Sequence, residues 1–293
     1  PPPTPPPPPR DLFFQPHHGI RHQPRSRGLG DVYKRQIIQG LTEFLPVSSS
    51  GHLALLPQIT GSKDQGQFID VAVHLGTLIA VILYFWIDVK LAFFGFFRLF
   101  VGDFTSKGSK LALLLILATL PVIVCGLILK LTGYNEIIRS MRAIGWAMLV
   151  FGILLYFVDQ NSQQSRNKDD WGFQDSYKIG LWQAIALIPG ASRSGMTIIG
   201  ARRLGFNRID SANISMLMSI PTILASGALL GSEVYFNADW QSARIGLIAA
   251  FFSFCAGLLA LNIMMKMLKS ISYTPYVVYR IILGIIILWI SYT

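Results

Sequence analysis

Two apolar segments far apart in the chain each break at a proline and continue into a turn rich in serine and glycine. The first is QGLTEFLPVSSSGH, from Gln39 to His52, and the second is QAIALIPGASRSGMT, from Gln183 to Thr197. Each apolar run could begin a membrane helix, so the break places polar groups at membrane depth. Hydrocarbon offers no water to a broken backbone, and such a break persists only where protein buries it or where it lines a wet cavity. Two breaks in one chain therefore predict a functional site.

The composition agrees with a polytopic membrane protein. Of the 293 residues, 52% are hydrophobic and 14% are charged, whereas soluble domains have roughly 25% charged residues. The net charge of +10 suits anionic lipid headgroups. Outside the first 36 residues the sequence has no basic face with interleaved aromatic residues, so it does not indicate a nucleic-acid partner. Cys125 and Cys255 both lie inside apolar runs and suggest neither a disulfide nor a thiolate metal site.

The first 36 residues do not resemble part of a fold. They begin with a polyproline tract and continue as a mixture of Arg, His, Pro and Gly with almost no apolar run. They also lack the apolar region of a signal peptide. We expect residues 1–36 to be a disordered or foreign tail that shortens the first helix, and residues 37–293 to form one integral membrane domain.

Six apolar segments are long enough to cross a hydrocarbon core of about 30 Å. They are residues 68–87, 111–131, 141–158, 209–231, 245–268 and 275–291. The two broken segments, residues 37–60 and 178–203, are better interpreted as re-entrant helix–turn–helix hairpins that return to their starting sides. The predicted fold is all-α, with six transmembrane helices and two re-entrant hairpins.

The charge distribution predicts that the two hairpins enter from opposite sides. In this topology one face collects 12 Lys and Arg residues and the other face only 4, so the first face is predicted to be cytoplasmic. The first hairpin then enters from outside and the second from inside. The run from Gln39 to Gly51 also resembles the run from Gln183 to Gly195, with a one-residue offset in the turn. Together these features predict an inverted repeat.

Glu43 is the one glutamate within an apolar helical run, and Gln39 lies one helical turn before it on the same face. An ionisable group at membrane depth marks a functional site by default. A carboxyl that only caps the serine-rich turn is the structural alternative. A carboxylate beside a glutamine can hold Mg²⁺ or Ca²⁺ through oxygen atoms, so Gln39 and Glu43 are candidate metal ligands. No His or Cys cluster occurs, and zinc is not expected.

Two histidines lie in the membrane domain. His52 directly follows the serine-rich turn, within reach of a hydroxyl and a carboxylate, which suits a general acid or base. His74 lies in the middle of a plain apolar span and is interpreted as a structural residue.

Arg193 lies between Ser192 and Ser194, with Thr197 one turn further on. A guanidinium, several hydroxyls and open backbone N–H groups in one turn suit a phosphate group. An arginine that snorkels from a helix end is the structural alternative, and it fails if the turn lies at mid-membrane. The two broken segments together favour phosphoryl transfer or hydrolysis over simple transport of a molecule across the membrane.

Both motifs resemble those of the bacterial undecaprenyl-diphosphate phosphatase family, also known as bacitracin-resistance proteins. The family's first motif, Glu/Gln-x-x-x-Glu followed by Pro-x-Ser-Ser-x-Gly-His, corresponds to Gln39 to His52. Its second motif, Pro-Gly-x-Ser-Arg-Ser-x-x-Thr, corresponds to Pro189 to Thr197. The resemblance covers residues 37–293. Gln39 is the Gln variant of the first pair, so this pair supplies one carboxylate and one amide.

The resemblance implies removal of the terminal phosphate from undecaprenyl diphosphate at the outer face of the bacterial plasma membrane. This reaction would recycle the lipid carrier for peptidoglycan synthesis and confer bacitracin resistance. The resemblance also implies dependence on a divalent cation and agrees with the inverted-repeat fold. A homodimer is compatible with the sequence but is not required by it.

Our hypothesis places the diphosphate between the two turns. Its charge would be neutralised by Arg193 and a nearby metal, with hydroxyls from Ser48, Ser50, Ser192, Ser194 and Thr197. Two routes remain open. Ser49, activated by His52 or Glu43, would form a phosphoserine, or a water held by the metal would attack while His52 protonates the leaving group.

A transporter or flippase for a prenyl-phosphate lipid is the alternative from another class. Inverted repeats with broken helices are common in transporters, and a phosphate-binding turn could carry a headgroup across the membrane. A purely structural scaffold is disfavoured by the presence of Glu43, His52 and Arg193 in the two motifs.

Overall fold

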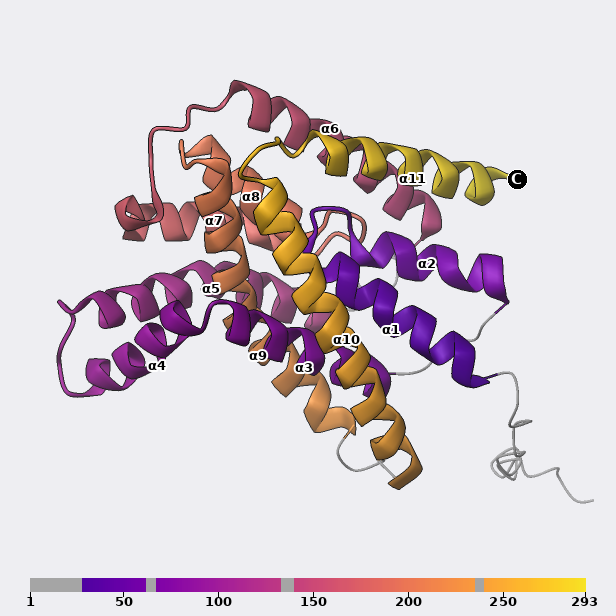
Figure 1. Cartoon of the computed structure of the whole chain (residues 1–293), viewed down its shortest axis with the longest axis horizontal. Coiled ribbons are helices and arrows are strands. Elements are labelled where there is room, and N and C mark those ends of the chain that lie inside the picture. The colour runs from indigo at the N-terminus through magenta and orange to yellow at the C-terminus, as the bar shows by residue number, and fades with distance from the viewer. Residues whose placement is uncertain (1–27, 62–66, 133–139, 235–239) are drawn as a thin grey trace, which may run out of the picture.

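The computed structural model describes residues 28–61, 67–132, 140–234 and 240–293. In these ranges the regular structure is helical apart from one isolated β-bridge between Arg166 and Phe206. The helices (Figure 1) are α1 (Gly28–Phe44), α2 (Ser49–Thr60), α3 (Gln67–Tyr84), α4 (Trp86–Phe100), α5 (Lys107–Thr132), α6 (Met141–Asn161), the 3₁₀ helix η2 (Lys168–Asp170), α7 (Phe173–Ile185), α8 (Arg193–Arg203), α9 (Arg208–Val234), α10 (Trp240–Met267) and α11 (Thr274–Tyr292). The all-α prediction is confirmed for this part of the chain.

Five of these helices are long and apolar enough to cross a membrane: α5, α6, α9, α10 and α11. In each of these helices only 33–44% of an apolar stretch of 18 residues is buried inside the molecule. The remainder is an extended apolar surface of the kind that lipid covers, since soluble monomers rarely expose such large patches. The chain is therefore a multi-pass membrane protein, as predicted.

The remaining predicted span, residues 68–87, does not continue as one straight helix. Helix α3 ends at Tyr84, and α4 begins at Trp86 at an angle of 98° to it, so the two make a sixth crossing only if the bent pair is one span. Packing of α4 against α5 accompanies the bend. A Cβ atom on Gly95 would lie 2.0 Å from the backbone of Gly108, and glycine at this position permits the close approach.

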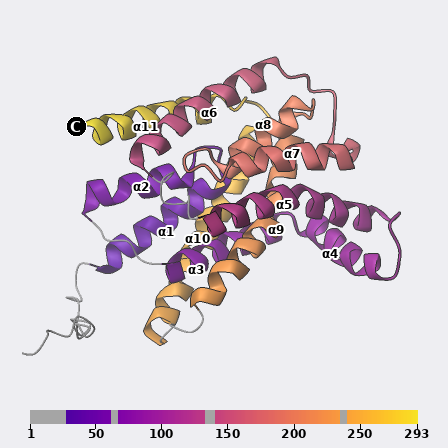
Figure 2. The same cartoon turned by 180° about the vertical axis from the view of Figure 1, so that it is seen from behind.

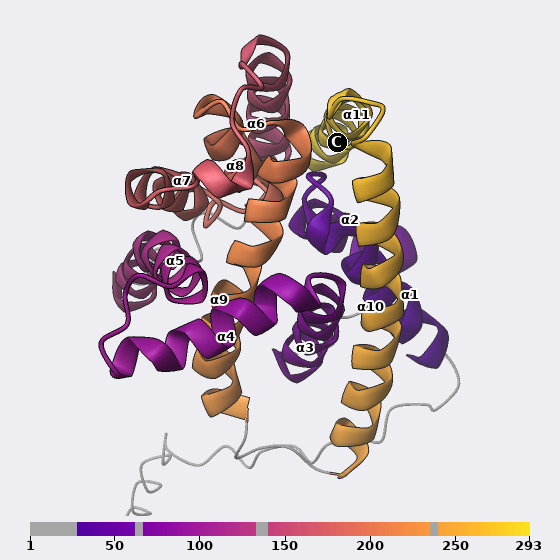
Figure 3. The same ribbon diagram turned by 60° about the vertical axis from the view of Figure 1, so that its left-hand side comes forward.

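The helix partners of the two hairpins correspond in pairs. Helix α1 packs against α10, and α7 packs against α5; likewise α3 packs against α10, and α9 packs against α5. Helices α3 and α9 also contact each other, and α6 lies along α11, as Figures 1 and 3 show. Seen from behind in Figure 2, α7 lies beside α5. Each hairpin is thus held by one long helix of the other half of the chain.

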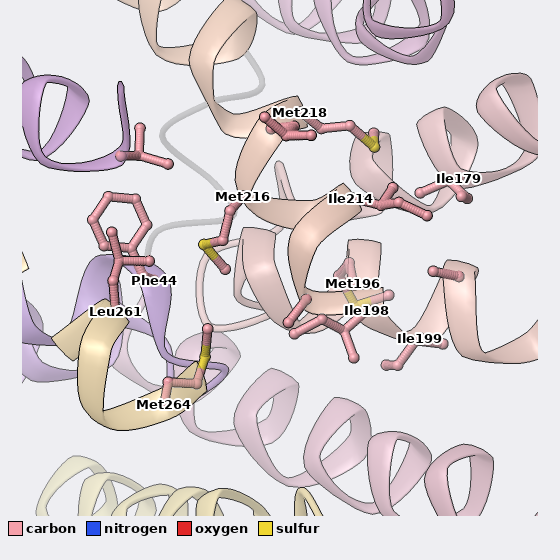
Figure 4. Close-up of a cluster of buried hydrophobic side chains, with 14 of the residues drawn as sticks. Phe44, Ile179, Met196, Ile198, Ile199, Ile214, Met216, Met218, Leu261 and Met264 are labelled. Atoms are coloured by element: carbon pink, nitrogen blue, oxygen red, sulfur yellow. The ribbon is translucent and has the colours of Figure 1, made fainter. Parts of the chain in front are cut away.

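A shared apolar core lies behind the turn ends of the two hairpins (Figure 4). Phe44 of α1 and Leu261 of α10 lie on one side of the cluster, Met196 and Ile198 of α8 on the other, and Met216 of α9 between them. All five side chains are almost completely buried. Because protein interiors are closely packed, this cluster fixes the last residue of α1 relative to the first turn of α8.

The predicted tail and domain boundary differ from the structure in one respect. Residues 28–36 form the first part of α1, whereas we expected the ordered domain to begin at residue 37. Residues 1–27 of the predicted tail lie outside the described residues.

Candidate functional site

The structure brings the two interrupted segments into direct contact. The first turn, residues 45–48, joins α1 to α2, and the second turn, residues 186–192, joins α7 to α8. The backbone N–H of Gly190 donates a hydrogen bond to Ser50 Oγ at 2.9 Å. In the other direction, Ser194 Oγ donates to the carbonyl of Leu45 at 3.0 Å. The two turns therefore form one hydrogen-bonded unit, although they are about 140 residues apart.

In both turns a serine with the same unusual backbone conformation directly precedes the next helix. Ser48 has φ 72° and Ser192 has φ 71°, and they are the two residues other than glycine with positive φ in the described ranges. This conformation is uncommon and costs energy for a residue with a Cβ atom. Its repetition at matching positions aims the N-termini of α2 and α8 into the same region.

An ion pair joins the two hairpins at this point. Arg193 Nη2 lies 2.8 Å from Glu43 Oε1, and the side chains are only 17% and 10% exposed. The second carboxylate oxygen of Glu43 accepts a hydrogen bond from Ser49 Oγ at 3.4 Å. Arg193 Nη1 is buried and has no hydrogen-bond partner among the described residues. Since buried polar groups are normally satisfied, this guanidinium nitrogen is available for an anionic ligand.

The N-terminus of α8 adds to the attraction for an anion. Ser192 caps the helix by accepting a hydrogen bond from the N–H of Gly195 at 3.2 Å, and its hydroxyl also lies 3.2 Å from that of Ser194. The first-turn N–H groups of a helix carry partial positive charge and bind phosphate groups readily. Arg193 is the first residue of this helix, so its guanidinium and the helix terminus act together.

A cavity of about 580 Å³ lies between the two turns and α3. This volume is in the usual range for small-ligand sites, roughly 300–1,000 Å³. Thr42 and a few apolar residues form part of its lining. The predicted site residues in the lining are Gln39, Glu43, Ser48, Ser49, Ser50, Ser192 and Arg193. The cavity has the size and the donor set for a phosphate-bearing headgroup.

Sequence comparison assigns the chain to a known family. Residues 35–286 match the family described as bacitracin resistance protein BacA. The chain belongs to this BacA family. Its relatives include proteins named undecaprenyl-diphosphatase from Dinoroseobacter shibae, 58% identical over 257 residues that cover 88% of this chain and 96% of the relative, and from Jannaschia sp., 57% identical over 256 residues that cover 87% and 96%. A protein named undecaprenyl-diphosphatase 1 from Rhodospirillum rubrum is 41% identical over 262 residues, covering 87% of this chain and 93% of the relative.

Two predicted phosphate-binding hydroxyls of this BacA chain hold the protein backbone instead of lining the cavity. The Ser194 hydroxyl is directed to the Leu45 carbonyl of the first turn. Thr197 is fully buried, and its hydroxyl donates to the Arg193 carbonyl at 3.0 Å and contacts Ser215 Oγ. Both side chains fix the start of α8, so in this structure they shape the site without facing it.

His52 is also engaged outside the cavity. Its Nδ1 lies 2.8 Å from the Ser48 carbonyl and must donate there, because a carbonyl only accepts. Its Nε2 then accepts from the Tyr279 hydroxyl at 2.7 Å, and the two rings are stacked with their centroids 5.5 Å apart. Both ring nitrogens are therefore occupied. The acid–base role expected for His52 stays a prediction, and Glu43 is the titratable group that contacts Ser49.

His74, which we interpreted as structural, lines the same cavity together with Asp70. Its Nδ1 lies 2.7 Å from the Asp70 carbonyl and 3.3 Å from Gln39 Nε2. Asp70 and His74 are four residues apart and share one helix face. Two ionisable side chains at i and i+4 within an apolar segment were the sequence signal that could have identified Asp70 and His74 as site residues.

The residues around Glu43 fit a weakly held hard cation. Gln39 and Glu43, the predicted ligands, both line the cavity, and each can supply oxygen. No group of three or more His, Cys, Asp or Glu side chains in the described ranges could hold a metal by itself. Mg²⁺ commonly uses one or two carboxylates and takes its other ligands from water and substrate phosphate. This donor set is therefore suited to a cation that binds with the diphosphate.

Proposed function

We propose that this chain hydrolyses undecaprenyl diphosphate to undecaprenyl phosphate and inorganic phosphate. The observation that carries the proposal is the Glu43–Arg193 pair, with Ser49 against it, at the meeting point of the two turns. The relatives at 55–58% identity are named for this activity. The reaction would recycle the lipid carrier for peptidoglycan synthesis and give tolerance to bacitracin.

The terminal phosphate binds at the second turn. Arg193 Nη1, which has no protein partner in the described structure, and the N-terminus of α8 donate to its oxygens. Ser192 and the first-turn serines are close enough to orient it in the cavity. Because these donors are preorganised in a site of low dielectric, they stabilise the charge that spreads over the phosphoryl oxygens in the transition state.

Ser49 is the nucleophile that the geometry favours. Its hydroxyl already points at Glu43 Oε2, and a contact of 3.4 Å before substrate binds shortens readily in the complex. The Ser49 oxygen attacks the terminal phosphorus, its proton passes to Glu43, and the bond to the bridging oxygen breaks, so that undecaprenyl phosphate leaves. The departing phosphate oxygen takes that proton from Glu43, which becomes a carboxylate again. Glu43 then removes a proton from a water that attacks the phosphoserine, and it returns this proton to Ser49 Oγ as inorganic phosphate leaves. Direct attack by such a water is the competing route.

A divalent cation, Mg²⁺ or Ca²⁺, would be held by Glu43 and Gln39 with phosphate oxygens of the substrate. When bound, it would neutralise negative charge on the diphosphate. With or without a bound cation, the residues of the chain position the phosphate and move the proton.

The membrane layout proposed with this function has six crossings, two re-entrant hairpins and an inverted repeat. The corresponding helix partners of α1 and α7, and the matching positive φ angles of Ser48 and Ser192, support the repeat. The excess of Lys and Arg on one face supports an orientation with that face in the cytoplasm. The cavity would then open to the outer side of the bacterial plasma membrane, where the diphosphate is released.

A phosphate-release assay on the purified wild-type protein tests the function. With undecaprenyl diphosphate in detergent, we expect equal amounts of inorganic phosphate and undecaprenyl phosphate, and no release by the Glu43→Gln variant. Reconstituted vesicles that bind the lipid and move it between leaflets without releasing phosphate would instead identify a carrier.

A further inference from the structure

Arg280 of α11 carries a buried charge that the hydrolysis mechanism does not use. Its side chain is completely buried, and it forms no ion pair among the described residues. Two of its three nitrogens bind backbone carbonyls instead: Nε donates to Met148 at 3.0 Å, and Nη2 donates to Gly190 at 2.7 Å and to Ala191 at 2.6 Å. Its Nη1 is buried and has no hydrogen-bond partner among the described residues. Burying an unpaired charge is costly, so this arrangement calls for a specific explanation.

The two carbonyls that Arg280 binds belong to the second turn, directly before the Ser192–Arg193 start of α8. Arg280 does not line the cavity, so carbonyls bonded to it direct their negative ends away from a bound phosphate. Gly190 is also held from the other side, because its N–H donates to Ser50 Oγ. Arg280 and the first hairpin thus hold the same residue, Gly190, the former at its carbonyl and the latter at its N–H.

The fit around Arg280 is tight on the side of α8. A Cβ atom on Gly195 would lie 3.0 Å from Arg280 Nη1, which is closer than ordinary side-chain contacts. The glycine in the Ser-Arg-Ser-Gly sequence therefore makes room for the guanidinium beneath the first turn of α8. The anion-binding turn and Arg280 pack as one unit.

The preceding residue, Tyr279, reaches the first turn. Its hydroxyl donates to His52 Nε2 at 2.7 Å, and His52 Nδ1 donates to the Ser48 carbonyl at 2.8 Å. Ser48 is the residue with positive φ at the end of that turn. Two successive residues of one helix therefore contact the two hairpins, Tyr279 through His52 and Arg280 directly.

We propose that Tyr279 and Arg280 are positioning residues that align the two turns across which Glu43 and Arg193 pair. They act through the backbone of the turns and do not touch the substrate. The proposal rests on the proposed function for its kinetic readout, but the alignment can also be measured by binding alone.

The test compares Arg280→Met, Arg280→Lys and Tyr279→Phe in the full-length protein. A misplacement of about 1 Å can cost roughly 10²-fold in rate, so we expect Arg280→Met to lower kcat by about that factor. KM should rise as well, because the misplaced donors also hold the ground-state diphosphate less well, but by a smaller factor than kcat falls, because these donors are aimed at transition-state charge. Arg280→Lys, which keeps a donor for the carbonyls, should recover part of the loss, and Tyr279→Phe should lower kcat by about 10-fold.

Matched controls separate alignment from general damage. Arg142→Met removes another arginine that binds a carbonyl of α11, that of Ser291, and Tyr276→Phe removes a hydroxyl one turn before Arg280. Both should leave kcat and KM within about two-fold of the wild type, and thermal unfolding of each variant shows that it is folded. Because Tyr279 and Arg280 serve one geometry, the double variant should lose less than the product of the single losses.

Folded Arg280→Met and Tyr279→Phe proteins with wild-type kcat and KM would overturn the inference. If Arg280→Met does not fold, Tyr279→Phe decides it. Binding of a prenyl methylenediphosphonate, which cannot be hydrolysed at the bridging position, gives a second readout, and we expect Arg280→Met to weaken it. If the wild type releases no phosphate, the proposed function fails, while the binding comparison still supports or overturns the alignment.

Discussion

The guanidinium of Arg193 lies 2.8 Å from the carboxylate of Glu43, although the two residues are 150 positions apart in the chain. Glu43 is the second-to-last residue of α1 in one hairpin, and Arg193 is the first residue of α8 in the other. Neither charge could be left alone at this depth, because an unpaired buried charge costs several kcal/mol. The pair therefore joins the hairpins and places a base and an anion-binding group in one cavity.

Replacing Arg193 by alanine should lower phosphate release by about 10²–10³-fold, the usual cost of removing one preorganised donor to a transition state. It should also lower the Tm, since Glu43 loses its partner. The double variant Glu43→Gln/Arg193→Ala should regain the Tm but not the rate. Arg203→Ala, at the other end of α8 and stacked on Trp182, is the control and should change neither. Near-normal release by Arg193→Ala would refute the role of Arg193.

Replacing Ser49 by alanine should reduce release by at least about 10²-fold if the hydroxyl is the nucleophile. Acid quenching during turnover, followed by mass spectrometry of the peptide that contains residue 49, should detect a phosphoryl group in the wild type. Ser226→Ala, which removes a hydroxyl bonded only within α9, should behave like the wild type. A Ser49→Ala protein with near-normal rate would favour direct attack by water.

Removing divalent cations with a chelator should abolish phosphate release, and adding Mg²⁺ or Ca²⁺ should restore it. Glu43→Asp shortens the expected ligand and should raise the cation concentration needed for half-maximal rate by about 10-fold or more. Asp88→Asn changes a carboxylate that pairs with Lys168 outside the cavity and should leave that concentration unchanged. Full activity in the presence of the chelator would exclude a required cation.

The ion pair between Arg166, in the loop before α7, and Asp175, in the first turn of α7, should make stability depend on pH. Burial raises the pKa of the Asp175 carboxyl, but hydrogen bonds from Arg166 and the Gly172 N–H and the charge of Arg166 outweigh it and keep that pKa below its ordinary value. A lowered folded pKa gives stability that is present above the unfolded pKa, about 3.9, and is lost as pH falls through the folded pKa.

The matching measurement is the Tm of the wild type and of Asp175→Asn at several pH values. The variant should unfold about 5 °C lower near pH 7, because hydrogen bonds to charged groups contribute roughly 1.5–3 kcal/mol. The difference should shrink below about pH 4. Asp169→Asn, in the neighbouring 3₁₀ helix, is the control and should leave the Tm near pH 7 unchanged. A gap that persisted at low pH would contradict the ion-pair account.

Orientation can be measured by cysteine labelling in a background with Cys125→Ser and Cys255→Ser. A membrane-impermeant maleimide should label Arg244→Cys in intact spheroplasts, since the predicted topology puts this residue on the face with only four Lys and Arg residues. Lys168→Cys should be labelled only after permeabilisation. The reverse pattern would place the cavity on the cytoplasmic side.

Much of the site was predictable because its signals are local. The i, i+4 spacing of Gln39 and Glu43, the serine-rich turn after Pro46 and the Ser-Arg-Ser run around Arg193 each lie within one helical turn or loop. Polar groups of this kind inside apolar runs are costly unless they serve a site. The same reasoning identified five of the six predicted spans, which the structure has as long apolar helices, since span length follows from bilayer thickness.

The sequence by itself determined that the chain is an all-helical membrane protein with two interrupted hairpins and the chemistry for a phosphate group. Only the tertiary structure decided the 98° bend between α3 and α4, the turning of His52 toward Tyr279 and the support of the second turn by Arg280. These features depend on contacts between residues up to 227 positions apart. Which side chain fills a given place in a close-packed interior is settled by neighbours from other helices, and no local pattern records them.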